Sequence, residues 1–324
     1  MTQKTSIPIT TLCSIPRNER CLGTPREYCS EADYWWPGPG GVYERLDGQK
    51  NPDAYHAHRA ALHSMARDIP KLVLSGDYET AGKILNAWFV DPETAMVPHL
   101  KYGQGIPGRC EGRCQGIVDT LPLVEVTRSA EIAGIDIKPW FREYLKWITT
   151  NPLGLFASCE PNNHATSYWL QVAEFSRYVG DQGAFQKCVT TFPKLLDQVA
   201  PNGSFPAELE RTRSFTYSLM QLDLISALAE ILGSWSVTLE DGRCLSQAFG
   251  FMIPAIKDKT KWQRPDIILW DELPVRQTFL LLASRALGRS DYADLWEALP
   301  RTDNPELLRN FPLQHEKLWL SRLP

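Results

Sequence analysis

Apolar residues recur at helical spacing from about residue 56 almost to the end of the chain. In residues 57–74, for example, one helical face collects Ala61, Met65, Ile69 and Leu72. Asp77 then occupies a typical N-cap position for the next helix. The same periodicity predicts later helices at about 116–133, 139–148, 165–179, 181–200, 214–232, 243–257, 275–287, 290–298 and 306–320.

Strand signals are scarce, and short loops join the predicted helices. This pattern predicts an all-α fold made of antiparallel helical hairpins. Two layers of such hairpins can close into an α/α toroid with a cleft at one end. An open α-solenoid would use the same hairpins, but solenoids have a fixed-period repeat that this sequence lacks. We therefore predict the toroid, a barrel of antiparallel helical hairpins.

The first 55 residues have a different character from the rest. They contain turn-forming clusters such as Trp36-Pro37-Gly38-Pro39-Gly40-Gly41 and no helical periodicity. We predict that residues 1–55 form an extended arm packed on the main domain, and that residues 56–324 form the toroid. Within the toroid, residues 91–113 are predicted to be a loop rich in proline and glycine.

Composition excludes several classes of partner. A formal net charge of −4 argues against binding nucleic acid through a broad basic surface. No run of about 18 apolar residues is found, so no transmembrane helix is expected. The first ten residues lack the apolar stretch of a signal peptide. The chain would therefore be cytoplasmic if Met1 is its native start, or secreted if a leader has been removed. The oligomeric state is left open.

No metal or organic cofactor is predicted. The eight cysteines include no C-x-x-C pair and no zinc-finger spacing, and we expect mostly free thiols, although Cys110 and Cys114 could close a bridge. His56 and His58 would point about 160° apart on a helix and cannot share a metal there. The segment 103–108 matches G-x-G-x-x-G, but no apolar strand precedes it and a proline interrupts it, which argues against nucleotide binding.

Two predicted helices begin with polar residues suited to an anion. Asn162-Asn163-His164 precedes one of them, and either asparagine is a good N-cap. Glu210-Arg211-Thr212-Arg213 leads into the other, which continues to Tyr217. Free N–H groups and a partial positive charge at helix N-termini favour bound anions. Asn163 could serve only as a cap, Tyr217 could be a core residue, and either Arg211 or Arg213 could make a bidentate contact.

Several motifs resemble alginate lyase domains, in order from about residue 30 to about residue 235. The matching stretches are Tyr34-Trp35-Trp36-Pro37, Asp47-Gly48 with Asn51-Pro52, Trp88-Phe89-Val90-Asp91-Pro92, Tyr102-Gly103-Gln104-Gly105-Ile106-Pro107-Gly108, Gly116-Ile117-Val118-Asp119-Thr120, Asn162-Asn163-His164, and Glu208-Leu209-Glu210-Arg211 running on to Tyr217. The chain is similar to the α/α-toroid polysaccharide lyases of families 5 and 38, which cleave alginate or glucuronan.

The resemblance implies β-elimination at a uronic acid of an acidic polysaccharide. Carried over by motif, Asn163 and Arg211 would neutralise the C5 carboxylate. Tyr217 would protonate the departing O4, and either His164 or Tyr217 would remove the C5 proton. Tyr102, Gln104 and Arg109 would be lid and subsite residues. The remaining candidates for binding substrate are Arg113, Arg213, Tyr168, Trp35 and Trp36.

Some features depart from the family pattern. The spacing from Arg211 to Tyr217 is one residue shorter than in family 5 and closer to family 38, and residues 108–116 look altered beside the usual lid. These departures leave open whether the polyuronate is alginate, especially polymannuronate, or glucuronan. An alternative is a catalytically repurposed toroid that binds an anionic glycan or a small acid. An α-solenoid scaffold would leave the two polar helix starts unexplained.

Overall fold

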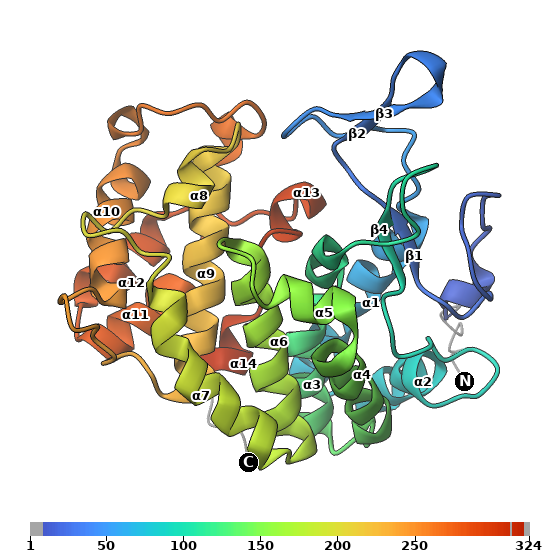
Figure 1. Cartoon of the computed structure of the whole chain (residues 1–324). Helices are drawn as coiled ribbons and strands as arrows, with labels where there is room; N and C mark the ends of the chain where they lie inside the picture. The colour runs from blue at the N-terminus through green and yellow to red at the C-terminus, as the bar shows by residue number, and fades with distance from the viewer. Residues whose placement is uncertain (1–8, 312, 321–324) are drawn as a thin grey trace.

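The computed structural model describes residues 9–311 and 313–320. Its helices form two layers (Figure 1). The inner layer consists of α1 (Ala57–Leu74), α3 (Leu123–Ala133), α6 (Asn163–Val179), α9 (Ser214–Leu232) and α11 (Phe279–Leu287). The outer layer consists of α2 (Tyr78–Phe89), α4 (Lys138–Thr150), α7 (Gln182–Leu196), α10 (Leu245–Lys257) and α12 (Ser290–Ala298).

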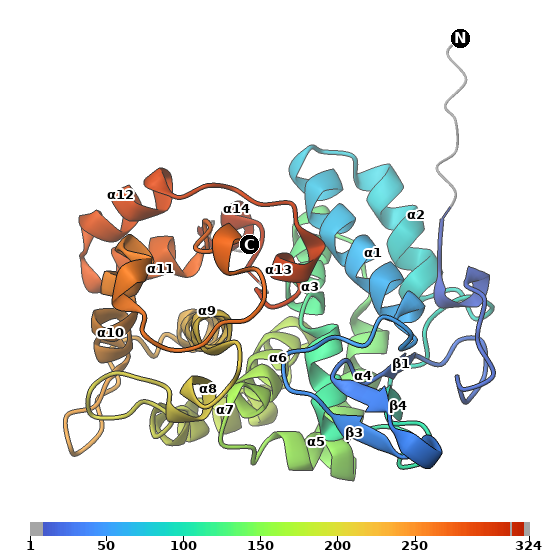
Figure 2. The ribbon, with the colours of Figure 1, turned by 90° about the horizontal axis from the view of Figure 1, so that it is seen from above.

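Inner helices pack against one another in chain order, from α1 to α3, α6, α9 and α11. In Figure 2, α1 to α5 lie on one side and α9 to α12 on the other, with α6 and α7 between them. The short helix α14 (Glu316–Leu320) contacts both α11 and α3 and so links the two sides. The predicted all-α toroid is confirmed.

The central position of α6 and α9 follows from their composition, because both are buried on nearly every face. By length and composition α9 could cross a membrane, with a hydropathy of 1.2, but 83% of that stretch is buried inside the protein. The sequence of α9 contains no continuous apolar run, because polar residues such as Gln221 and Asp223 interrupt it. We interpret α9 as a core helix of the toroid.

Several helix boundaries differ from the prediction. The segment 116–133 is divided into the 3₁₀ helix η3 (Cys114–Thr120) and α3, and Pro122 stands at the N-cap of the second part. The segment 275–287 becomes helical only at residue 279. Two short helices that open with proline were not predicted at all, namely α5 (Pro152–Ala157) and α8 (Pro206–Leu209).

The predicted final helix is replaced by α13 (Pro305–Leu308) and α14. Between them the backbone N–H groups of Gln314 and His315 donate to Glu125 on α3, at 2.8 and 2.9 Å. The indole of Trp319 donates to the same carboxylate at 2.8 Å. A buried carboxylate therefore takes hydrogen bonds that a continuous helix would have used internally, and it anchors the end of the described chain to the core.

Short strands bring the N-terminal arm against the glycine-rich loop. Strand β1 (Cys29–Glu31) pairs in parallel with β4 (Tyr102–Gly105), and β2 (Trp35–Pro37) forms an antiparallel hairpin with β3 (Tyr43–Arg45). Gly112 allows the loop to fold closely here, since a Cβ at this position would lie 2.1 Å from the carbonyl oxygen of Lys101. The remaining 3₁₀ turns are η1 (Leu12–Ser14), η2 (Pro39–Gly41), η4 (Lys259–Lys261) and η5 (Trp270–Glu272).

Candidate active site

A cavity of about 440 Å³ lies where five segments of the chain meet. The arm contributes residues 33–35 and Arg45, and the glycine-rich loop with η3 contributes Gln104, Arg113, Gln115 and Val118. The start of α6 contributes Glu160 and residues 162–164. The start of α9 contributes Arg211, Tyr217 and Met220, and the end of α13 contributes Arg309 and Asn310. The two polar helix starts identified in the sequence therefore face one cavity.

The tautomer of His164 follows from its hydrogen bonds. Asn162 is the N-cap of α6, and its Oδ1 accepts the backbone N–H of His164 at 3.0 Å. The same Oδ1 lies 2.7 Å from His164 Nδ1. A backbone N–H can only donate, so Asn162 presents its oxygen and Nδ1 carries the proton. The Nε2 lone pair of the neutral ring is left without a protein partner in the described residues, which suits a proton acceptor.

The surroundings of His164 keep its ring neutral. Burial lowers the pKa of His164 to about 3, assisted by the positive charges of Arg211, Arg113 and Arg45. Its ordinary pKa is about 6.5. At neutral pH the imidazole is therefore uncharged and able to accept a proton.

Asn163 is held by a buried carboxylate. Its backbone N–H donates to Glu208 on α8 at 2.8 Å, and its Nδ2 lies 2.9 Å from each oxygen of that carboxylate. Burial raises the pKa of Glu208 above its usual range. The pair fixes the orientation of the Asn163 amide at the cavity wall.

Arg211 is clamped to the arm. Its Nε and Nη2 donate to Asp47 at 3.1 and 2.8 Å, and Asp47 also accepts the backbone N–H of Thr212 at 3.1 Å. These contacts lower the pKa of Asp47 to about 2, against the opposing effect of burial. Gly48 permits the approach, because it has a φ of +75° and a Cβ there would lie 2.4 Å from Thr212 Oγ1.

Tyr217 projects from the first turns of α9 toward the arm. Its hydroxyl lies 2.5 Å from that of Tyr34, and the Arg211 guanidinium lies over its ring at 4.0 Å from the centroid. Burial and the neighbouring Tyr34 raise the pKa of Tyr217, while Arg211 and Arg213 partly oppose this. The phenol therefore keeps its proton at neutral pH and is suited to donate it.

The glycine-rich loop is fixed from behind by Asp119, which is fully buried. Asp119 accepts hydrogen bonds from Ser30 Oγ at 2.7 Å and from Gln104 Nε2 at 3.0 Å. Gln104 has a φ of 53°, and its backbone N–H donates to Ser30 Oγ at 2.8 Å. Gln104 in turn accepts from Arg113, which brings that arginine to the cavity.

Only some of the predicted substrate-binding residues line this cavity. Trp35, Gln104 and Arg113 line the cavity together with Asn163, His164, Arg211 and Tyr217. Tyr168 is only 2% exposed and packs against Trp169 in the core, and Arg213 is buried beside the start of α9. Of the two competing arginines, the structure therefore brings Arg211 and not Arg213 to the cavity wall.

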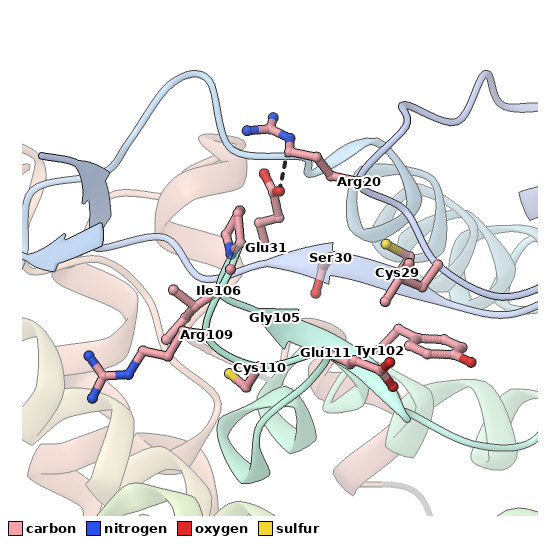
Figure 3. A pocket seen from close by; sticks show the side chains of 13 residues that line it. Arg20, Cys29, Ser30, Glu31, Tyr102, Gly105, Ile106, Arg109, Cys110 and Glu111 are labelled. Atoms are coloured by element: carbon pink, nitrogen blue, oxygen red, sulfur yellow. Dashed lines mark ion pairs between the residues drawn. The ribbon is translucent and has the colours of Figure 1, made fainter. Parts of the chain in front are cut away.

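Tyr102 and Arg109 line a second cavity of about 440 Å³ on the β1–β4 ribbon (Figure 3). The Arg20–Glu31 ion pair, at 3.1 Å, stands at its edge. Arg109 lies over Trp35 at 4.7 Å and so joins the rims of the two cavities. Trp36 lines neither of these cavities and donates its indole N–H to the carbonyl of Gln49 at 2.9 Å.

Several residues of the cavity were not singled out as site candidates, among them Tyr34, Asp33, Arg45 and Arg309. Tyr34 stands inside a motif that resembles the family, which could have drawn attention to it. Asp33, Arg45 and Arg309 belong to no recognisable pattern. Asp33 is bound by Arg59 at 2.6 Å and also pairs with Arg309, so the arm, α1 and α13 meet at one buried carboxylate.

Among the described residues no group of three or more histidine, cysteine, aspartate or glutamate side chains could hold a metal ion. His56 lies 3.2 Å from Asp33, and His58 Nδ1 accepts the backbone N–H of Cys29 at 3.2 Å. All eight cysteines are free thiols, including Cys110 and Cys114.

Comparison with known proteins gives one family and one fold. The family model described as "Alginate lyase" matches residues 11–262. An alginate lyase from Bacteroides ovatus superposes with a TM-score of 0.82 and 28% identity, covering 98% of this chain and 89% of that chain. No curated protein sequence matches this chain significantly.

Two structures of alginate lyase A1-III, a histidine-to-alanine and a tyrosine-to-phenylalanine variant, were each solved with a tetrasaccharide. They superpose with TM-scores of 0.60 and 0.58 at 14% and 15% identity. The alignments cover 98% and 99% of this chain, and 88% and 92% of those chains. At this identity the likeness supports the fold alone.

Proposed function

The chain belongs to the alginate lyase family and is a polysaccharide lyase, and from this premise we propose that its cavity cleaves a polyuronate by β-elimination. The proposed substrate is alginate, especially polymannuronate, or glucuronan. Alginate lyase A1-III, which has a similar fold, was solved in complex with a tetrasaccharide, and this supports an oligosaccharide ligand.

One observation carries the proposal, namely a neutral histidine and a protonated tyrosine on one cavity wall. His164 offers an unprotonated Nε2 because Asn162 holds its Nδ1 proton. Tyr217 keeps its phenolic proton because its pKa is raised. At neutral pH the histidine is therefore unprotonated and the tyrosine protonated, which are the forms that a general base and a general acid need.

The reaction can be written with these two groups. Nε2 of His164 takes the C5 proton of the uronate. The electron pair of the broken C–H bond forms the C4–C5 double bond, and the bond from C4 to O4 breaks. O4 leaves with the proton of Tyr217, and that proton is later replaced from solvent. We assign the base to His164 because a tyrosine of raised pKa is a poor candidate for the ionised form.

The C5 proton becomes removable only when the adjacent carboxylate is neutralised, because the intermediate carries additional negative charge on that group. We assign charge-assisted hydrogen bonding of the carboxylate to Arg211, whose Nη1 has no partner among the described residues. The Nδ2 of Asn163 already lies against both oxygens of Glu208, so Asn163 can donate to the substrate only by exchanging one of these contacts, whereas Arg211 is positioned by Asp47 before substrate arrives. Preorganised donors of this kind stabilise developing charge without reorganising during the reaction.

The test is the ultraviolet absorbance of the unsaturated uronate during incubation with polymannuronate, polyguluronate and glucuronan, each separately. We expect absorbance to rise with at least one polymer. Tyr217→Phe should reduce the rate by about 100-fold or more while the fold is retained, since only a hydroxyl is lost. Tyr292→Phe, a substitution on α12 outside the cavity, is the matched control and should keep the wild-type rate.

A flat trace with all three polymers, from protein with a native circular dichroism spectrum, would contradict the proposal. The cleft would then be better described as a repurposed toroid. Retained activity in Tyr217→Phe would instead keep the reaction and remove Tyr217 as the acid.

A further inference from the structure

The arginines that line the active-site cavity differ in how their charge is compensated. Arg45 and Arg211 both pair with Asp47, at 2.6 and 2.8 Å. Arg309 pairs with Asp33, which is also bound by Arg59. Within residues 9–311 and 313–320, Arg113 has no carboxylate at ion-pair distance. Arg113 is therefore the lining arginine with no carboxylate against it, whereas Arg45 and Arg211 share one aspartate and together keep one positive charge.

Arg113 is held in place by neutral acceptors. Its Nε donates to the carbonyl oxygen of Gln104 at 2.9 Å, and its Nη2 donates to Gln104 Oε1 at 3.2 Å. The guanidinium also lies over the ring of Trp35, at 6.0 Å from the centroid. These contacts orient the side chain without cancelling its charge.

One edge of the guanidinium remains available. Nη1 of Arg113 has no hydrogen-bond partner among the described residues, and it is not one of their buried unsatisfied atoms. Nη1 is therefore accessible, and Arg113 lines both the active-site cavity and a small cavity beside Trp147. Arg213 differs in this respect, because its Nε and Nη2 are buried without partners and it does not line the cavity.

The acids of the cavity do not change this conclusion. Asp33 is engaged with Arg59 and Arg309. Glu160 lies 3.4 Å from Asn162 Nδ2 and 3.9 Å from the Cys114 thiol, and it makes no ion pair with Arg113. An anionic ligand would therefore find its strongest unopposed attraction at Arg113.

We propose that Arg113 supplies the net positive charge that neutralises the uronate carboxylate, while Arg211 acts through hydrogen bonding and is positioned by Asp47. This inference rests on the proposed function. It assigns the electrostatic stabilisation of the carboxylate to the glycine-rich loop and not to the start of α9. A carboxylate in contact with a guanidinium lowers the potential there, although Asp47 alone cannot cancel both Arg45 and Arg211, whereas no such contact lowers the potential at Arg113.

The substrate class follows from this geometry. A guanidinium with one free N–H edge suits a planar carboxylate, whereas a neutral sugar offers it no charge to bind. The site should therefore discriminate between a uronate and the same sugar with its carboxyl group esterified. The discrimination should depend on Arg113.

The experiment compares wild type with Arg113→Met and Arg113→Lys on two forms of the polyuronate that the wild type degrades. One form is native and the other carries methyl-esterified carboxyl groups. Arg142→Met is the matched control, since it removes one exposed positive charge from α4, far from the cavity lining. Thermal unfolding of every variant is measured alongside the kinetics.

We expect Arg113→Met to lower kcat/KM on the native polymer by about 100-fold or more, mainly through kcat. On the methyl ester, the kcat/KM of the wild type divided by that of Arg113→Met should approach one. Arg113→Lys should retain an intermediate rate because it keeps the charge, and Arg142→Met should match the wild type. An equal loss on both polymers, or no loss on the native polymer, would overturn the inference.

A binding measurement separates this inference from the proposed function. Calorimetric titration with a uronate tetrasaccharide should give weaker affinity in Arg113→Met than in Arg142→Met. If wild type binds in this Arg113-dependent way but forms no unsaturated product, the lyase proposal fails and recognition of the carboxylate by Arg113 stands. If affinity is the same in both variants, Arg113 does not recognise the carboxylate. If Arg113→Met fails to fold, the same comparisons are made with Arg113→Lys. An intermediate loss of rate on the native polymer alone supports the inference, and an equal loss on both polymers overturns it.

Discussion

The low pKa of His164 makes an unusual prediction about the acid side of the pH–rate profile. For an exposed histidine base of pKa about 6.5, kcat/KM falls once the pH drops below that value. In this protein burial, Arg211, Arg113 and Arg45 lower the pKa of His164 to about 3. We therefore expect kcat/KM to stay nearly constant from pH 7.5 down to pH 5.5.

The size of the difference follows from the neutral fraction of the imidazole. At pH 5.5, a histidine of ordinary pKa is only about 9% neutral, and the rate would fall about tenfold from its value at pH 7.5. With a pKa of about 3, the ring is still more than about 99% neutral at pH 5.5. Uronate carboxylates of ordinary pKa remain ionised throughout this range.

The free energy of unfolding must be measured in parallel, because other buried histidines make the folded state less stable as the pH falls. Burial lowers the pKa values of His58 and His63 to about 4. Between pH 4 and pH 6.5 the unfolded state therefore binds more protons than the folded state, and the free energy of unfolding falls as pH falls. At pH 5.5 each residue costs about 1.4 kcal/mol relative to pH above 7.

Initial rates of unsaturated-product formation would be measured between pH 5 and pH 8, with circular dichroism recorded at each pH. An acid limb near pH 6.5 in protein that stays folded would refute the assignment of a neutral His164 as the base. Arg113→Met offers a second test when the rates are extended below pH 5, because removing one nearby positive charge should raise the pKa of His164 and move the limb upward. Burial is the larger cause of the shift, so the limb should not return fully to pH 6.5.

Three further substitutions test how the site is supported. Glu208→Ala should lower kcat more than it raises KM, because it frees the Asn163 amide from its fixed orientation; steady-state kinetics at one pH would decide this, and an unchanged kcat would contradict it. Asp47→Ala should lower the free energy of unfolding by about 3 kcal/mol, measured in urea, since it leaves the half-buried Arg211 without its partner. Gly112→Ala should lower the melting temperature by several degrees or block folding, because its Cβ would lie 2.1 Å from a carbonyl oxygen; a wild-type melting temperature would show that the loop can adjust.

Local signals in the sequence predicted much of the helical framework. The N-cap role of Asp77 is confirmed, since its side chain accepts the backbone N–H of Thr80 at 3.1 Å. Of the two asparagines before α6, Asn162 is the cap and Asn163 is the first helical residue. These features depend on residues three or four positions apart, which is why spacing alone identifies them.

The remaining features depend on partners far away in the chain. Strand β1 is three residues long and pairs with β4 more than 70 residues later, so no local sequence pattern predicts it. The break before α14 arises because Glu125, on another helix, binds the backbone of Gln314. Tyr168 is buried because α6 is enclosed on all sides, and periodicity cannot distinguish such a helix from one with an open face.

The roles of the cavity residues also depend on which side chains are neighbours in the folded chain. The sequence placed Arg211 and Arg213 as equal candidates for the carboxylate. Only the fold reveals that Asp47 pairs with both Arg211 and Arg45, and that Arg113 has no carboxylate partner in the part of the chain that the structure describes. Charge compensation is a property of neighbours in space, and Asp47 lies 164 positions from Arg211 along the chain.

The ion pair between Asp33 and Arg309 joins positions that are 276 residues apart, and both residues line the cavity. Nearly the whole toroid must therefore be translated before this wall of the cavity can form. Nascent chains that stop short of α13 would carry both polar helix starts but not the finished pocket. Appearance of lyase activity during cell-free synthesis would consequently mark the arrival of the last helices, which also complete the hydrophobic core through Leu307 and Trp319.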